Sequence, residues 1–217
     1  MATGDELVRR ILDDETSSRA RSRATSYLLR ELGRGYPVER LAPLLMSDDP
    51  EVVQSGAWLV SEMGGKGVVL RGLITRLLDH AADRVRFHAL DSLLCWATPA
   101  DGVAIATAIS KVIDTSSAVR WKALRFLAAL GRSELEAGAA SLQGRLKELT
   151  LWLAGHEMDA FDRSEILTRL DASEPLVRSF AVAAAARMSW QDPSLLAHAK
   201  QSTDDDIREF ARTELEG

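Results

Sequence analysis

Three aromatic residues with charged neighbours are the side chains of this sequence best suited to recognition. Trp58, Phe87 and Trp121 occur at comparable places in three consecutive segments, and Asp91 and Arg125 lie four residues beyond the last two. Large rigid rings and an arginine with several donors carry much of the binding energy at protein interfaces. These five residues are the predicted partner-binding site. The alternative for any one ring is that it packs between helices.

No pattern in the sequence is typical of an active site. There is no Gly-x-Ser-x-Gly motif, and Cys95 lies in an apolar run that predicts a buried, inert thiol. The glycines and lysine at 64–67 resemble a phosphate-binding loop, but no strand precedes them and glycine follows the lysine where Ser or Thr is needed. That stretch is better interpreted as a helix stop and loop. The sequence therefore predicts no catalytic residue and no cofactor.

Metal binding has little support. The four histidines, at 80, 88, 156 and 198, share no ligand spacing. His156 with Glu157, Asp159 and Asp162 could hold a cation, but a loop is the favoured interpretation. No metal site is predicted. The other three tryptophans, Trp96, Trp152 and Trp190, lie near expected helix ends or in an irregular segment and are expected to pack.

A recurring phrase indicates how these residues are positioned. It consists of a turn, Val or Ile, Arg, two variable residues and a small residue, and it occurs at 82–89, 117–123, 174–181 and 205–211, with looser copies at 19–24 and 49–56. The spacing is 33 from Val52 to Val85, 34 to Val119, 58 to Val177 and 30 to Ile207. The interval of 58 must hold a degenerate unit. One such unit cannot bury its apolar face alone, so the units must stack.

Each unit is expected to be an antiparallel pair of helices. Apolar residues before the phrase, such as Leu41, Leu44 and Leu45, have helical i, i+3, i+4 spacing, and a second helix follows the phrase. The turns between the helices are rich in Asp, Ser and Pro, which cap or begin helices. Three glycines are expected to close second helices in a left-handed conformation: Gly33, Gly64 and Gly131.

This pattern resembles the HEAT repeat family over nearly the whole chain. The resemblance implies an all-α, right-handed solenoid of about six antiparallel helix pairs in a single domain, 1–217. Its approximate units are 5–33, 38–64, 70–98, 102–131, a degenerate 133–156, 162–190 and 193–217. In that family turn aspartates and the arginine after Val form a ladder between repeats. Here this implies Asp48 or Asp49, Asp79 or Asp83, Asp114 and Asp171, with Arg86, Arg120, Arg178 and Arg208.

Composition narrows the classes of partner. The net charge is −5, and residues 157–217 hold 13 acidic against 7 basic side chains. Such an acidic segment disfavours wrapping a nucleic-acid backbone, which requires many Lys and Arg, and suits a basic partner better. A single cysteine and the lack of a signal peptide or apolar span predict a cytoplasmic protein. Self-association through the terminal repeats is left open.

The expected function is non-enzymatic binding of a partner protein on the concave face of the solenoid. The small size and acidic balance suit an inhibitor, such as an immunity-type protein, for a basic partner. The alternative is a HEAT-like alkylpurine DNA glycosylase. Enzymes of that class carry aromatic residues and an Asp on a concave face, and here Trp58, Phe87, Asp91 and Trp121 would take those places. Resemblance to bilin lyases built from similar repeats has no supporting attachment motif. If Trp121 and Arg125 face the partner, replacing both with alanine should leave folding intact.

Overall fold

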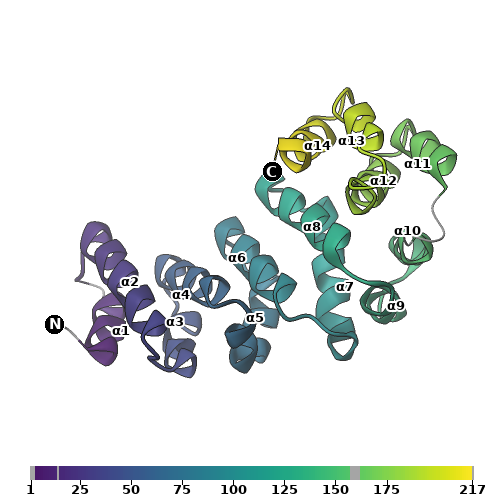
Figure 1. Cartoon of the computed structure of the whole chain (residues 1–217). Helices are drawn as coiled ribbons and strands as arrows, with labels where there is room; N and C mark the ends of the chain where they lie inside the picture. The colour runs from purple at the N-terminus through teal and green to yellow at the C-terminus, as the bar shows by residue number, and fades with distance from the viewer. Residues whose placement is uncertain (1–2, 14, 157–161, 217) are drawn as a thin grey trace. The chain divides into compact units, whose positions relative to one another are not determined.

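The computed structural model describes residues 3–13, 15–156 and 162–216, and every regular element in these ranges is a helix. The chain forms two compact units, residues 1–96 and 97–217. The elements of the first unit are α1 (Gly4–Leu12), α2 (Ser18–Gly33), the 3-10 helix η1 (Val38–Leu41), α3 (Ala42–Leu45), α4 (Pro50–Glu62), the 3-10 helix η2 (Gly64–Leu70), α5 (Arg71–Leu77) and α6 (Asp83–Leu94) (Figure 1).

The described residues of the second unit form four helix pairs and two short 3-10 segments. In chain order its elements are η3 (Pro99–Asp101), α7 (Gly102–Ser110), η4 (Lys111–Ile113), α8 (Ser117–Ala129), α9 (Arg132–Ala140), α10 (Gly144–Gly155), α11 (Arg163–Leu170), α12 (Pro175–Arg187), α13 (Ser194–Ala199) and α14 (Asp205–Glu216). Helix α12 packs against α8, α10 and α14. None of the described helices is both long and apolar enough to cross a bilayer.

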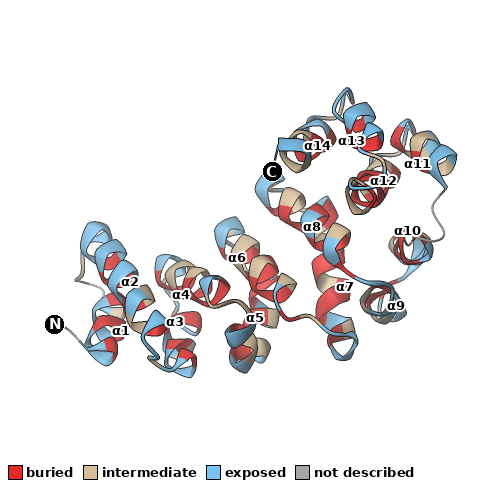
Figure 2. Cartoon of the chain, viewed as in Figure 1, coloured by how far each residue is buried: buried red, intermediate tan, exposed pale blue. Residues whose placement is uncertain are grey.

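The second helix of each pair supplies the core positions that follow the recurring phrase. Val52, Val85, Val119 and Val177 are all buried, as are the small residues four positions after the last three. Buried residues follow the helix faces that turn toward neighbouring helices (Figure 2). The apolar periodicity of the sequence therefore identifies the packed face of these helices correctly.

Turn residues begin the second helices as expected. In α4 the Asp49 carboxylate accepts a hydrogen bond from the Glu51 N–H at 2.8 Å, and Pro50 is the first helical residue. The glycine prediction is correct only for Gly64, which has φ of 54°. Gly33 still lies within α2, and the left-handed residue is Gly35, because the N–H of Arg34 closes the helix one step later. Gly131, with φ of −76°, precedes α9 instead.

The segment without a Val-Arg phrase also forms a helix pair, α9 and α10. Helix α9 approaches α7 closely at Gly138, where a Cβ atom would lie 2.6 Å from Cγ2 of Ile105. A glycine permits this contact because it places no side chain between the helices. Small residues at the interface thus replace the usual phrase in this unit.

Arginines of the recurring phrase bond carbonyls of the preceding turn, and Arg178 and Arg21 bond a carboxylate of the following turn. Arg178 donates to the carbonyls of Ala172 and Ser173 at 2.8 and 2.9 Å and to the Asp204 carboxylate at 2.7 Å. Buried Arg21 similarly reaches Asp49 at 3.0 Å. The partner of Arg178 is therefore the turn of the following repeat, and Asp171, which was assigned to the ladder, bonds His198 at 2.8 Å.

The remaining arginines of the implied ladder differ from one another. Arg86 donates to the carbonyls of His80 and Ala81, each at 2.8 Å. Arg120 bonds the Asp114 carbonyl at 2.7 Å and the Asp206 carboxylate, on α14, at 2.6 Å. Arg208 contacts Ser202 and Asp205 within its own unit. These three arginines all bond carbonyls of the turn before their own helix. Which carboxylate each one contacts depends on the element that lies next to it.

Tyr36 ties the loop after α2 to the first helix. Its hydroxyl donates to the Asp5 carboxylate at 2.6 Å, and its ring covers Gly4 so closely that a Cβ there would lie 2.3 Å from the ring. Burial and then the bond to Asp5 raise the pKa of Tyr36 to about 12. The N-terminal helix is thus held by a phenol that resists ionisation.

Titration of Tyr36 tests this contact. A Tyr27→Phe variant leaves Tyr36 as the remaining tyrosine of the two, and its phenolate absorbance is expected to rise near pH 12 instead of pH 10. Because the folded state holds this proton above the unfolded pKa, stability falls as pH rises from about 10 to about 12. Asp5→Asn should move the midpoint toward 10. A midpoint near 10 in the folded Tyr27→Phe protein, checked by circular dichroism, would contradict the contact.

Candidate functional site

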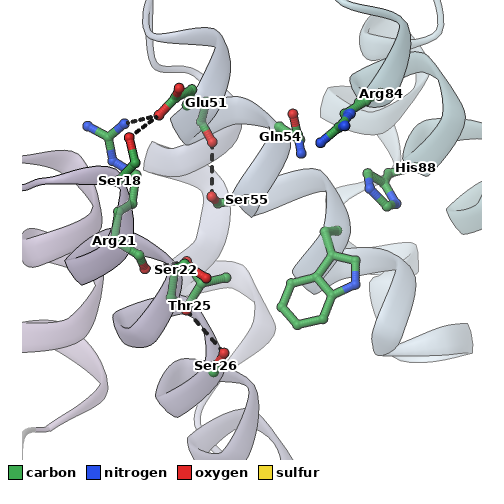
Figure 3. A pocket seen from close by; sticks show the side chains of 11 residues that line it. Ser18, Arg21, Ser22, Thr25, Ser26, Glu51, Gln54, Ser55, Arg84 and His88 are labelled. Carbon is green, nitrogen blue, oxygen red and sulfur yellow. Dashed lines mark hydrogen bonds and ion pairs between the residues drawn. The ribbon is translucent and has the colours of Figure 1, made fainter.

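A groove of about 670 Å³ lies over the second helices of the first unit. Helix α2 contributes Ser22, Thr25 and Ser26, α4 contributes Gln54 and Trp58, and α6 contributes Arg84 and His88. Figure 3 shows Gln54, Arg84 and His88 on the side opposite the hydroxyl residues of α2. The groove is open to solvent and mixed in character, with one large ring among polar groups.

Short side chains on α2 explain why the groove exists. Ser18, Ser22 and Ser26 are four residues apart, so they share one face of the helix. Helix α4 packs closely against α6 but more loosely against α2. Hydroxyl groups are too small to fill the space that a leucine or phenylalanine would occupy in a packed helix interface.

One end of the groove holds an ion pair between buried Arg21 and exposed Glu51. The Arg21 guanidinium, buried at 7% exposure, bonds Glu51 at 3.0 Å and the carbonyl of Ile11 at 3.2 Å. Ser18 donates to the same Glu51 oxygen at 3.3 Å (Figure 3). These partners, together with Asp49 at 3.0 Å, satisfy the arginine, whose single charge is shared by the two carboxylates.

The two walls differ in hydrogen-bonding character. Hydroxyl groups donate to carbonyls one turn earlier in their own helices: Thr25 to Arg21 at 2.9 Å and Ser26 to Ser22 at 3.1 Å. Their oxygens therefore remain as acceptors. On the opposite wall, the side chains of Gln54, Trp58 and Arg84 make no hydrogen bond to any residue that the structure describes. These three groups offer N–H donors to a ligand.

Helix α6 presents a different face from the one expected. Trp58 lines the groove, whereas Phe87 and Asp91 do not, and Arg84 and His88 line it instead. The Phe87 ring meets the His88 ring edge-on, with centroids 5.5 Å apart. Arg84 lies one position before Val85 and His88 lies three positions after it. The sequence alone did not single out the helix face that these two residues share. Their i, i+4 spacing was the available signal.

Trp121 and Arg125 lie in the second unit and contact its C-terminal helix. The Trp121 ring packs edge-on against Phe210 of α14, with centroids 6.4 Å apart. Arg125 pairs with Glu214 at 3.3 Å and stacks over Trp121, 5.4 Å from the ring centre. Replacing both with alanine therefore also removes contacts that hold α14, so intact folding is not expected.

Two expectations about single residues are wrong. Cys95 is exposed, because it is the C-cap residue that follows α6, and its thiol donates to the Asp91 carbonyl at 3.4 Å. Trp190 is 67% exposed, since it lies in the turn after α12 and not on a packed face. Trp96 is buried as expected.

The candidate metal and phosphate positions have structural roles among the described residues. Residues 64–67 begin the 3-10 helix η2. Glu157 and Asp159 lie outside the described residues, and no group of three ligating side chains occurs within 3–13, 15–156 and 162–216. His156 contacts Glu165 at 3.2 Å. Burial raises the pKa of Glu165, but hydrogen bonds from Arg169 and Trp152 outweigh it and hold the pKa below its usual value.

Solved structures with the same arrangement of helices span almost the whole chain. An engineered protein from a structural genomics consortium aligns with a TM-score of 0.57 and 18% identity, covering 100% of this chain and 96% of the other. This chain is an α-solenoid. A computationally designed armadillo repeat protein for modular peptide recognition aligns to the solenoid with a TM-score of 0.51 and 16% identity, covering 98% of each chain. No protein-family model matches the solenoid sequence, and no curated protein is significantly similar to it.

Proposed function

We propose that this chain is a non-enzymatic, HEAT-like solenoid that binds a partner protein, with the groove around Trp58 as the main contact. The observation that carries the proposal is a half-buried tryptophan beside side-chain donors that have no partner among the described residues. Donors of this kind lose little on binding when a partner satisfies them, and a central aromatic ring supplies buried area. The recurring Val-Arg phrase supports the HEAT assignment.

The other predicted partner-binding residues contribute less to binding in this proposal. Phe87 and Asp91 adjoin the groove residue His88 on α6 and would extend the contact. Trp121 and Arg125 already bind α14, so a partner would gain less from them. One of the similar structures was designed for peptide recognition. A groove over second helices suits the same type of ligand.

A more specific proposal concerns the acidic second unit, which would act as an inhibitor or immunity-type protein by binding a basic partner. Its support is the excess of acidic residues in 157–217. Part of that charge is used internally, since Asp204 pairs with Arg178 and Asp206 with Arg120. Binding of this kind would weaken steeply with salt, because exposed charges are screened. The glycosylase alternative gains no support, because Asp91 does not line the groove that holds Trp58.

Partner capture with a matched pair of variants tests the proposal. Tagged full-length chain is incubated with lysate of its own source, with and without nuclease, and bound proteins are identified by mass spectrometry. Trp58→Ser is expected to reduce capture of the principal partner more than about tenfold, as for a central aromatic contact. Trp190→Ser, which changes an exposed tryptophan elsewhere, should retain it.

The outcomes of this capture are distinct. A stoichiometric, nuclease-resistant protein that depends on Trp58 supports the proposal, provided circular dichroism shows that the variant is folded. A partner retained equally by Trp58→Ser places binding elsewhere and overturns the groove as main contact. Recovery of nucleic acid alone would favour the glycosylase class.

A further inference from the structure

We infer that the groove of the first unit recognises an extended peptide segment that carries a carboxylate side chain, with Arg84 as the carboxylate-binding residue. The inference deepens the proposed function and rests on it. It specifies both the backbone conformation and the charge of the ligand. Three separate features of the groove support it: its residual charge, the different hydrogen-bonding character of its walls, and its size.

The charge of the groove is concentrated at one side chain. Its lining holds two arginines, Arg21 and Arg84, and one glutamate. Arg21 is buried and is shared by two carboxylates, Glu51 and Asp49, each at 3.0 Å, so it offers no charge to a ligand. The exposed Arg84 guanidinium has no hydrogen-bond or ion-pair partner among the described residues. A carboxylate is its natural ligand, because the planar fork of donors matches both oxygens.

The walls of the groove favour an extended backbone. An extended chain directs its carbonyl and N–H groups outward to both sides, whereas a helix uses them internally. The donors Gln54 and Trp58 can meet carbonyls on one side, and the hydroxyl oxygen of exposed Ser26 can accept from an N–H group on the other. In Figure 3 the labelled residues Gln54 and Thr25 come from different helices and border the same space.

The size of the groove suits a short segment. A volume of about 670 Å³ is in the range of sites for small ligands and short peptides, and is too small for a broad globular surface. Trp58 offers an aromatic face next to these polar groups, which favours an apolar residue near the carboxylate. The expected ligand is therefore an extended stretch with Asp or Glu beside an apolar side chain.

Selection from a peptide library tests the inference. Random twelve-residue peptides displayed on phage are selected on the immobilised full-length chain, with counter-selection on an Arg84→Glu variant. We expect the surviving sequences to share Asp or Glu next to an apolar residue. Enrichment of neutral or basic sequences, or no enrichment at all, overturns the inference. The proposed function is judged separately, because a partner that binds through Trp58 in the capture experiment could still present a folded surface.

Binding of one selected synthetic peptide then locates the contact. Arg84→Glu is expected to weaken binding of this peptide at least about tenfold, because it removes a charge-assisted hydrogen bond and places a like charge beside the peptide carboxylate. Replacing the peptide carboxylate with its amide is expected to weaken binding by a similar factor, because the charge-assisted hydrogen bond is lost. The control Arg76→Glu makes the same charge change at an exposed position of α5, outside the groove, and should alter the Kd less than about threefold through screened long-range charge. The Trp58 indole N–H signal of ¹⁵N-labelled protein should shift on binding. Equal weakening by both arginine variants, or an unshifted indole signal, would show that the peptide binds elsewhere.

Discussion

Replacing Phe210 with alanine is expected to lower the free energy of unfolding of the second unit by about 3–5 kcal/mol. The Phe210 side chain is fully buried, and its ring meets Trp121 of α8 edge-on. Its removal costs the transfer of a large aromatic group and leaves a cavity between two helices that are distant in sequence. The loss should therefore detach α14 from α8 as well as weaken the last helix pair.

Chemical denaturation followed by circular dichroism measures this effect. Leu215→Ala is the matched control, because it shortens an apolar side chain on the same helix at a position that is 38% exposed. It should cost less than about 1 kcal/mol, as surface substitutions do. A Phe210→Ala protein as stable as the control would mean that α14 does not pack on α8, and would leave Trp121 and Arg125 open to a partner.

Arg178→Met is expected to destabilise the second unit by about 2–3 kcal/mol. The arginine is mostly buried at 18% side-chain exposure and holds two turn carbonyls together with the Asp204 carboxylate at 2.7 Å. Methionine keeps much of the volume but leaves these acceptors without their donor. The substitution thus separates the α11–α12 pair from the α13–α14 pair at the turns.

Two further variants distinguish the fork of donors from charge alone. Arg178→Lys keeps the charge but not the two nitrogens that bond the turn carbonyls and the Asp204 carboxylate separately, and should lose an intermediate amount of stability. Arg163→Met removes an ion pair to Asp192 at a position that is 54% exposed, and should cost less than about 1 kcal/mol. If Arg178→Met and Arg163→Met were equally mild, the inter-repeat bond to Asp204 would not contribute to stability.

Much of the fold is readable from local patterns. Apolar residues at i, i+3 and i+4 mark the packed side of each helix, and Val52, Val85 and Val119 are buried where that pattern places them. Asp49 and Pro50 begin α4 because a carboxylate can satisfy a free N–H and proline needs none. These effects act within one or two helical turns, so the order of residues is enough to predict them.

The candidate site was predicted less completely. Trp58, one of the predicted partner-binding residues, lines the groove. The comparable place on α6 is Phe87, with Asp91 one turn later, but the groove is bordered there by Arg84 and His88. The rotation of a helix about its axis is set by the volumes of the side chains on both of its neighbours, and a rule based on one repeat does not contain them.

The sequence by itself determined the helix pairs, their caps, the core positions and the repeating arrangement of an α-solenoid, because periodicity and capping are local. Only the tertiary structure decided that Arg178 bonds Asp204 and not Asp171, and that Trp121 and Arg125 are engaged by α14. It also decided that small hydroxyl residues on α2 leave a groove beside Trp58. These outcomes depend on which side chains meet across repeats, and that is fixed by packing between elements far apart in the chain.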